Sequence, residues 1–375
     1  KCTKIISFVA AFNSGVSLTN LPVEIIEKIA AQTNFDPNDH TILSLLETSF
    51  CIGAAVGTFI TPLYTKKLGL TKSLFILFII QLLASGVSAI PVYWIYLVTM
   101  RFVTGLGSSS LASLSPLLVA ENLDPQARGK TVMMFAIALN LGVFAAYIIH
   151  FTLSFQYDFW YFTFLTPIIV SFVGIITTQV LIKINKQKRK DRVGQQEEII
   201  QTEQIIHSDT FIPTLAEENT EAFDQRYHQQ IASIDFNAKL TRTQFKRILY
   251  ITIALGLMQM FTGVDAIVIY ASNIFSDTFK SEKSGIYGSM IIGAVNCICT
   301  FVAAPFAEHK PRRVMLLIGV IGAGVCDLII AICYIAKADS YIILLFIMLF
   351  FMFYNLGPEP IVFMFFSEMF PERYK

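Results

Sequence analysis

Long apolar stretches separated by short polar connections run through the whole chain of 375 residues. Each stretch is close to the roughly 20 residues that an α-helix needs to cross a bilayer. The ten stretches fall at about 5–21, 42–64, 73–91, 94–119, 129–150, 159–183, 248–275, 285–307, 313–336 and 341–366. This pattern predicts an all-α membrane protein with ten transmembrane helices.

One long polar interval, at 185–247, divides these stretches into six before it and four after it. It opens with a basic run at 186–192, and isoleucine pairs follow at near-helical spacing, so we expect short amphipathic helices in it. Two six-helix halves joined by such a loop are typical of transporters built from parallel repeats. We therefore expect a first bundle at 1–184, a cytoplasmic loop at 185–247 and a second bundle at 248–375, truncated by two spans.

Lysines and arginines gather in alternate connections between the predicted spans. The rich connections hold Lys66, Lys67, Lys72, Arg128, Lys130, Lys183, Lys310, Arg312, Arg313 and Arg373. The other connections hold only Lys28, Lys280, Lys283 and Lys337. Because positively charged loops stay in the cytoplasm, we expect both termini to be cytoplasmic.

Composition excludes several other functions. The chain is 54% hydrophobic and 15% charged, whereas soluble domains are about 25% charged. The net charge of +1 says little by itself, but the sequence shows no strongly basic face that would suggest nucleic acid. Histidines are scattered and show neither nucleophile nor metal-ligand spacing, so nothing indicates an enzyme, a metal site or a cofactor.

The seventh predicted span carries unusual polar residues. Gln259, Thr262 and Asp265 lie within its apolar stretch, and Gly263 interrupts it. Lipid solvates polar side chains and broken backbone poorly, so this helix should face protein or a water-filled path. Such a helix is typical of a transporter's substrate site, although a buried helix with incidental polar residues would show the same pattern.

Charged residues recur at the predicted cytoplasmic helix ends. Glu121 and Arg128 lie between the fourth and fifth spans, and Glu368 and Arg373 follow the tenth. Acid–base pairs at these places could hold one conformation and break in another; ordinary solvated helix-end charges are the alternative. Arg101, near the outer end of the fourth span, could snorkel to the surface or form an ion pair.

Five linked motifs match one family in order along the chain. They are Phe12-Asn13-Ser14-Gly15-Val16, the pattern from Arg101 through Gly105 and Pro116 to Glu121, Arg128 and Gly129, the segment from Gln259 to Ala266, Asn296, and Gly357-Pro358-Glu359-Pro360-Ile361 followed by Glu368-Met369-Phe370-Pro371. On these motifs the chain resembles the sugar porters of the major facilitator superfamily, and most of all the facilitative glucose transporters.

The resemblance implies the major facilitator fold, with two helical bundles and ten of its expected twelve transmembrane helices present. It implies a multi-pass protein, with the plasma membrane as the default location, that moves a small sugar by alternating access; the oligomeric state is left open. Carried over from the motifs, the substrate-binding residues are Gln259, Met260, Asp265, Asn296, Asn355 and Phe363. The gating residues are Gly357, Pro358 and Pro360, which weaken the tenth helix, with Glu121, Arg128, Glu368, Arg373 and Arg101.

Departures from the family pattern concentrate at the expected sugar site. The fifth-span glutamine of the family falls on Ala136, which cannot hydrogen-bond through its side chain. Met260 replaces a second glutamine, Asp265 replaces an asparagine and Phe363 replaces a tryptophan. The site thus has fewer amides and one added acid, which favours a specialised substrate.

The transport mode depends on two positions. Proton-coupled members of the family tend to carry aspartate where this chain has Asn13, and asparagine cannot titrate, so we expect facilitative uniport. Asp265 leaves an alternative, because an intramembrane carboxylate is a candidate for carrying a proton or binding an amino substrate. A transport-dead sugar sensor on the same fold is a second alternative.

Overall fold

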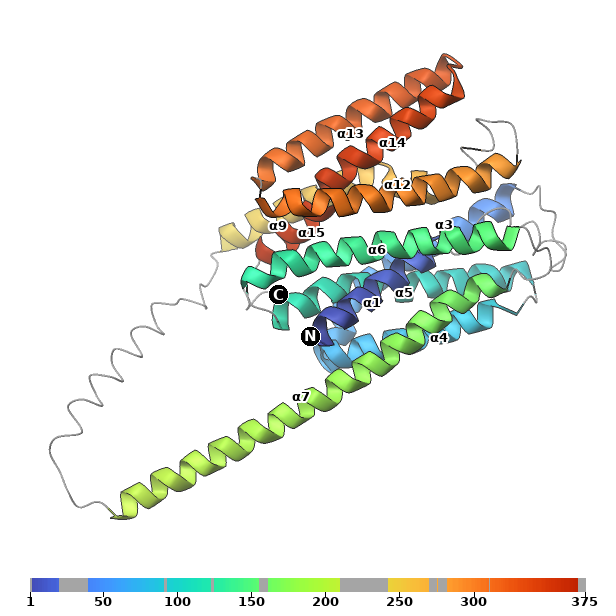
Figure 1. Ribbon diagram of the computed structural model, residues 1–375. Coiled ribbons are helices and arrows are strands. Elements are labelled where there is room, and N and C mark those ends of the chain that lie inside the picture. The colour runs from blue at the N-terminus through green and yellow to red at the C-terminus, as the bar shows by residue number, and fades with distance from the viewer. Residues whose placement is uncertain are drawn as a thin grey trace.

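A computed structural model describes residues 2–19, 40–90, 93–122, 125–154, 161–209, 242–269, 275, 282–309 and 311–369. The described helices of the first half are α1 (Cys2–Leu18), α3 (His40–Leu68), α4 (Leu70–Ser88), α5 (Trp94–Asn122), α6 (Pro125–Ser154) and α7 (Phe162–Asp209). Those of the second half are α9 (Arg242–Phe261), α10 (Val264–Ile269), α12 (Glu282–His309), α13 (Arg312–Ile335), α14 (Ser340–Leu356) and α15 (Pro358–Met369). These helices run side by side in a bundle (Figure 1).

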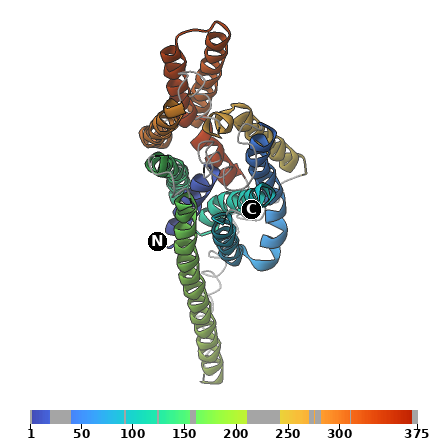
Figure 2. The same cartoon turned by 90° about the vertical axis from the view of Figure 1, so that its right-hand side faces the viewer.

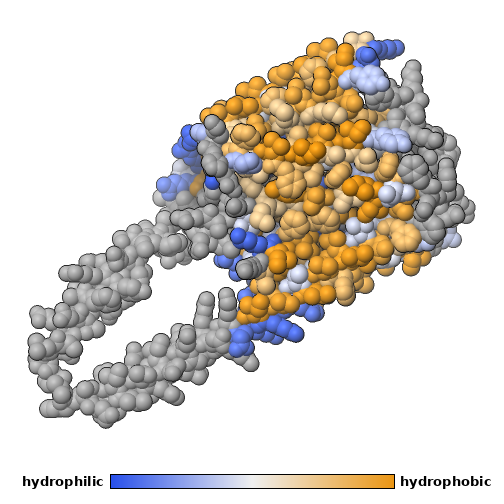
Figure 3. All heavy atoms as spheres, in the orientation of Figure 1, coloured by the Kyte–Doolittle hydropathy of each residue, from blue (hydrophilic) through white to orange (hydrophobic). Residues whose placement is uncertain are grey.

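Within the described residues, eight helices are long and apolar enough to span a membrane, and α1 is a shorter apolar helix. Orange, hydrophobic atoms cover most of the bundle's side in Figure 3, and blue, hydrophilic atoms lie toward its ends. This distribution is what a lipid-facing helical protein requires, because lipid cannot hydrogen-bond to polar groups. The predicted all-α membrane fold is confirmed.

Small residues allow the helices of the first half to approach closely. A Cβ atom added at Gly53 would overlap the Phe102 carbonyl oxygen, so α3 and α5 are in contact along their backbones. A Cβ atom at Gly15 of α1 would overlap the Leu139 carbonyl oxygen of α6 in the same way. Close backbone approach at small residues is the main packing device of membrane helices.

Two of the predicted spans are broken helices. The seventh span is divided into α9 and α10 at Gly263, whose φ of 75° is accessible to glycine at little steric cost. The tenth span is divided into α14 and α15 at Gly357. Pro358 is the first residue of α15, a position where its missing N–H costs no hydrogen bond. Both breaks fall in the second half.

The apolar part of the sixth span ends at Gln187, close to the predicted end of the span at residue 183, but its helix continues further. Helix α7 runs without a break to Asp209 and projects away from the bundle (Figures 1 and 2). The sequence offers a reason, since glutamine, glutamate, lysine and arginine fill this segment and all are good helix formers. A single long helix therefore stands at 185–209, where we expected the first of several short ones.

The two halves meet along α6, which packs against α12 and α15. One shared hydrophobic cluster joins Val143 and Tyr147 of α6 to Ile292 of α12 and Phe350 of α14. A second joins Met133 of α6 to residues of α13 and α15, including Met315 and Ile361. The interface between the halves is apolar over both clusters. Helix α6 also carries a buried polar residue, Asn140.

Candidate functional site

Four side chains form a closed ring of hydrogen bonds where the halves meet. Asn296 Nδ2 donates to Asn140 Oδ1 at 3.0 Å, and Asn140 Nδ2 donates to Thr300 Oγ1 at 2.7 Å. Thr300 Oγ1 donates to Asn355 Oδ1 at 2.5 Å, and Asn355 Nδ2 donates back to Asn296 Oδ1 at 2.7 Å. We call these four residues the amide ring. All are at most 4% exposed, where polar groups need hydrogen-bond partners.

The ring draws its members from three helices. Asn296 and Thr300 lie one turn apart on α12, so they share one face of that helix. Asn355 lies in the last turn of α14, and Asn140 lies near the middle of α6. Asn140 is the member that belongs to the first half. The ring therefore joins the halves through the hydrogen bonds of one side chain.

Glu359 extends the ring. Its Oε1 accepts a hydrogen bond from Asn140 Nδ2 at 2.8 Å, and the residue is 5% exposed. It lies in the first turn of α15, where the helix dipole favours a negative charge. The break at Gly357 creates this helix end, so the broken helix itself provides a place for the carboxyl group.

Gln259 of α9 also lies in the interior. It is 7% exposed, and its Nε2 donates to the Tyr354 hydroxyl at 3.3 Å. The expected sugar-binding residue of the seventh span is therefore bonded to Tyr354 of α14, the residue before Asn355 in the chain. Met260, the next residue, is 62% exposed, since successive side chains point in different directions around a helix.

Several of the expected site residues have side chains outside the described part of the structure. For Asp265, Phe363, Arg128 and Glu368, the structure describes the helix but not the side chain. Arg373 lies wholly outside the described residues. Their substrate and clamp roles stay predictions. Glu121 is exposed at the end of α5, and partial desolvation by neighbouring atoms raises the pKa of its carboxyl group.

The expected weak point of the tenth helix lies at close helix contacts. A Cβ atom added at Gly357 would lie 2.6 Å from the Met315 carbonyl oxygen of α13. Gly319 of α13 faces this point, and a Cβ atom there would lie 2.7 Å from the Gly357 Cα. Pro360 lies in the first turn of α15 and is buried. Gly357, where the tenth span is broken, therefore packs directly against Gly319 of α13 with no side chain between them.

Arg101 is buried in the first half, with 8% of its surface exposed. Its Nη1 donates to the Ser17 carbonyl oxygen at 3.0 Å, and its guanidinium group lies 4.9 Å from the centre of the Phe50 ring. Ser17 is in the last turn of α1, where unpaired carbonyls and the helix dipole attract a cation. These contacts account for an arginine at this depth better than snorkelling does.

Asn13 lies close to this arginine site in sequence and packing. It is fully buried, and its Nδ2 donates to the Ser171 hydroxyl of α7 at 2.8 Å. Ser17 Oγ lies 3.4 Å from Asn13 Oδ1 and accepts from Gln81 Nε2 at 2.6 Å. A neutral network of amides and hydroxyls therefore fills this part of the first bundle.

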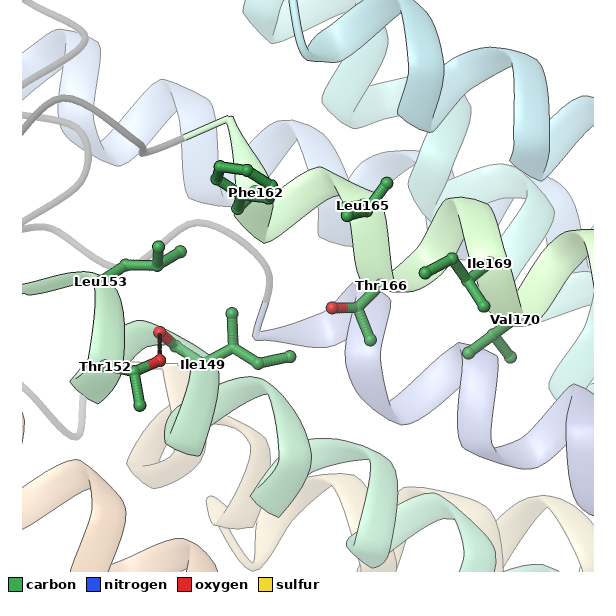
Figure 4. A pocket seen from close by; sticks show the side chains of 8 residues that line it. All are labelled: Ile149, Thr152, Leu153, Phe162, Leu165, Thr166, Ile169 and Val170. Atoms are coloured by element: carbon green, nitrogen blue, oxygen red, sulfur yellow. Dashed lines mark hydrogen bonds between the residues drawn. The ribbon is translucent and has the colours of Figure 1, made fainter. Parts of the chain in front are cut away.

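A cavity of about 440 Å³ lies elsewhere, between α6 and the start of α7 (Figure 4). Its lining is Ile149, Thr152, Leu153, Phe162, Leu165, Thr166, Ile169 and Val170. Thr152 Oγ1 already donates to the Ile149 carbonyl oxygen. Mainly aliphatic walls offer few partners for sugar hydroxyls, so the amide ring is the better candidate for a sugar site.

Sequence reasoning found Asn296, Asn355 and Gln259 but missed Asn140, Thr300 and Glu359. The signals were present: Asn140 is an amide inside an apolar span, and Glu359 is an acid in another, which marks candidate functional residues. Asn140 lies one helical turn beyond Ala136. An amide side chain is therefore present on this helix one turn further along than the position where the family has its glutamine.

The model of a family described as "Sugar (and other) transporter" matches residues 2–375. The chain belongs to the sugar transporter family. One relative is the glucose transporter GlcP of Staphylococcus epidermidis, which is 24% identical over 348 residues that cover 90% of this chain and 74% of the relative. Another is the bovine facilitated glucose transporter member 2, which is 22% identical over 88% of this chain and 65% of the relative. The galactose-proton symporter of Escherichia coli is 23% identical over 86% of this chain and 69% of the relative.

Solved structures share the fold of this sugar transporter. The major facilitator proton:xylose symporter XylE, bound to 6-bromo-6-deoxy-D-glucose, superposes with a TM-score of 0.76 at 18% identity, covering all of this chain and 82% of XylE. The predicted major facilitator fold is thus confirmed, and the chain is an integral, multi-pass membrane protein. Membership of this family makes it a transporter protein and not an enzyme. Because the relatives include a facilitated transporter and a proton symporter, relationship alone does not decide the transport mode.

Proposed function

We propose that the protein carries a hexose or a related sugar across the membrane by alternating access, as a facilitative uniporter. One observation carries this proposal: a buried ring of three amides and a hydroxyl lies between the halves. Amides both donate and accept without carrying charge. They therefore suit a neutral ligand with many hydroxyl groups.

Alternating access requires the halves to move relative to each other around the site. Asn140 of the first half contacts Thr300 and Glu359 of the second, so the site lies on the moving boundary. A sugar bound there would exchange hydrogen bonds with the ring. The breaks at Gly263 and Gly357 give the second half two places where helix direction can change.

Uniport is supported by the first bundle. Asn13 stands where proton-coupled members of the family tend to carry aspartate, and it lies in a neutral network with Ser17 and Ser171. An amide does not titrate, so this position cannot carry a proton across the membrane. Asp265 stays an alternative proton carrier.

The experiment that tests this proposal measures uptake of labelled glucose, galactose and xylose into proteoliposomes holding the purified protein. We expect saturable uptake and counterflow that an imposed proton gradient does not change. Accumulation driven by the gradient and abolished by an uncoupler would overturn uniport. An Asp265→Asn variant tested in parallel shows whether that acid carries the proton.

A sugar sensor without transport is the second candidate. It is favoured by the hydrogen bonds that already close the amide ring, since a closed site need not open to either side. Thermal stabilisation of the protein by a sugar, without counterflow of the same sugar, would support the sensor. Flux of any hexose would exclude it.

A further inference from the structure

The cavity between α6 and the start of α7 lies away from the amide ring, in the membrane-spanning part of the first half. Both helices pack against α1, and α7 lies at the edge of the bundle (Figure 1). The lining residues fall at the end of one apolar span, Thr131–Leu153, and at the beginning of the next, Phe162–Gln187. Phe162, Leu165 and Ile169 of this lining are exposed at the surface of the bundle. The cavity is therefore accessible from the lipid.

Two threonine hydroxyls border this otherwise apolar cavity, one from each helix. The Thr152 hydroxyl donates its hydrogen to the Ile149 carbonyl oxygen at 2.8 Å, so its oxygen keeps acceptor positions only. The Thr166 hydroxyl points from α7 toward the space between the helices (Figure 4) and has no hydrogen-bond partner among the described residues. It therefore has a donor hydrogen to offer. A ligand that satisfies both threonines must accept one hydrogen bond and donate another.

The hydroxyls lie near the ends of the two spans, and most of the aliphatic lining lies deeper. At a rise of about 1.5 Å per residue, Thr152 is roughly 1.5 Å and Thr166 roughly 6 Å inside the ends of their apolar spans. Ile169 and Val170 lie about one turn further into the span of α7, and Ile149 lies about one turn into that of α6. The cavity is therefore polar near the boundary between hydrocarbon and headgroups and apolar below it.

This arrangement matches a compact membrane lipid that has one hydroxyl group. A phospholipid presents ester carbonyls at this level, which accept hydrogen bonds but do not donate them, whereas a hydroxyl does both. A hydroxyl without a partner is costly in hydrocarbon. The volume of about 440 Å³ is typical of sites for compact ligands, which measure about 300–1,000 Å³. A rigid ring system fills such a space with less loss of conformational entropy than a flexible chain.

We propose that the cavity between α6 and α7 binds a sterol from the surrounding bilayer. The sterol hydroxyl accepts a hydrogen bond from Thr166 and donates one to Thr152, and the ring system packs against the deeper aliphatic side chains. None of the lining residues belongs to the amide ring. Sterol binding therefore does not depend on which sugar the protein carries, or on whether it carries one.

The test uses the purified protein in nanodiscs of phosphatidylcholine that contain a diazirine-bearing cholesterol with a free 3-hydroxyl group. Light-induced labels are mapped by peptide mass spectrometry, and we expect them on residues 149–153 and 165–170. Unlabelled cholesterol should displace the probe at a concentration about tenfold lower than its 3-keto analogue, which accepts a hydrogen bond but cannot donate one. Labels spread evenly over the lipid-facing helices, or equal displacement by the ketone, would overturn the proposal.

Three threonine variants assign the two hydrogen bonds. Thr166→Val keeps the shape and removes the donor, so displacement by cholesterol should need a concentration about tenfold higher. Thr152→Val removes the acceptor, so cholesterol should lose its advantage over the ketone. Thr177→Val is the matched control on α7, because its hydroxyl donates to carbonyl oxygens of its own helix and lies outside the cavity. Full affinity in Thr166→Val, or an equal loss in Thr177→Val, contradicts the assignment.

A bulky side chain tests the cavity itself. Val170→Phe fills it and should abolish the labels on both segments, whereas Val173→Phe, on the same helix but outside the lining, should leave them. Cholesterol in the nanodisc should also raise the melting temperature of the unsubstituted protein and of Val173→Phe, but not that of Val170→Phe. Labels that survive in Val170→Phe would show that the sterol binds elsewhere. If a diazirine-bearing phosphatidylcholine labels the cavity and cholesterol does not displace it, the occupant is a phospholipid chain and the sterol site is wrong.

Discussion

At the scale of single residues, Asn140 concentrates the contact between the halves. Its side chain donates to Thr300 and Glu359 and accepts from Asn296. An isolated buried hydrogen bond contributes about 1 kcal/mol, but removing one partner leaves the others unsatisfied at a cost of about 1–3 kcal/mol each. One substitution here therefore affects three other side chains.

We predict that Asn140→Ala reduces sugar transport by at least about tenfold, since it removes roughly 1.4 kcal/mol or more of binding. Uptake kinetics in proteoliposomes measure this effect. Thr152→Ala on the same helix is a suitable control, because Thr152 is exposed and its hydroxyl donates to the Ile149 carbonyl oxygen of its own helix. Equal losses in both variants would show that α6 is merely sensitive to substitution.

Arg101 offers a residue-scale test of stability. We predict that Arg101→Met lowers the free energy of unfolding by about 1–3 kcal/mol, because the carbonyl end of α1 loses a cation and Phe50 loses a cation–π contact. Arg101→Lys should recover part of this loss, as lysine keeps the charge but not the planar group. Melting temperatures of the detergent-purified variants measure the order, and Lys below Met would contradict it.

At the scale of helices, glycines determine which pairs can approach closely. Gly53 of α3 and Gly105 of α5 each face a backbone carbonyl of the other helix, at Phe102 and Phe50 respectively. A side chain at either position would separate the pair. The same α3 also holds Gly57 against Leu106, so the contact extends over two turns.

We predict that Gly53→Ala destabilises the protein by about 1–3 kcal/mol, as over-packing typically does, because even a Cβ atom there would overlap the Phe102 carbonyl oxygen. Gly86 of α4 is the matched control, since nothing lies within 4 Å of a Cβ atom added there. Gly86→Ala should be neutral or stabilising by up to about 1 kcal/mol, because alanine favours the helix. Thermal unfolding of the two variants separates packing from helix propensity.

The helices also show which features could be predicted from the sequence and which could not. Apolar stretches predicted nearly all helices, because membrane spans must satisfy their own backbone. Isoleucine pairs predicted helix after the sixth span, but they did not show that this helix is continuous with the span as far as Asp209. Asn140 and Glu359 were missed for a different reason: a single polar residue in a span gains meaning only when its partners on other helices are known.

At the scale of the whole molecule, basic residues share one end of the bundle. Helix α1 begins and α15 ends toward the end from which α7 projects (Figure 1). Lys66 and Lys67 lie in the last turn of α3, and Arg312 and Arg313 begin α13. Lys337 lies in the turn between α13 and α14, at the opposite end of α13.

We predict that the basic end is cytoplasmic. In intact cells, a membrane-impermeant thiol reagent should label a Lys337→Cys variant and should not label Lys67→Cys until the membrane is permeabilised. Both positions are exposed, so access and not burial decides the outcome. The unsubstituted protein, with its own six cysteines, provides the background, and the reverse labelling would invert the topology.

The closed amide ring has a kinetic consequence for a carrier that rocks about it. An empty site can reorient only by separating Asn140 from its partners in the other half, with nothing to take their place. A bound sugar supplies replacement hydroxyls, so the loaded protein meets a lower barrier. Exchange of sugar for sugar should therefore run faster than net flow into an empty compartment, and the return of the unoccupied carrier should limit the cycle.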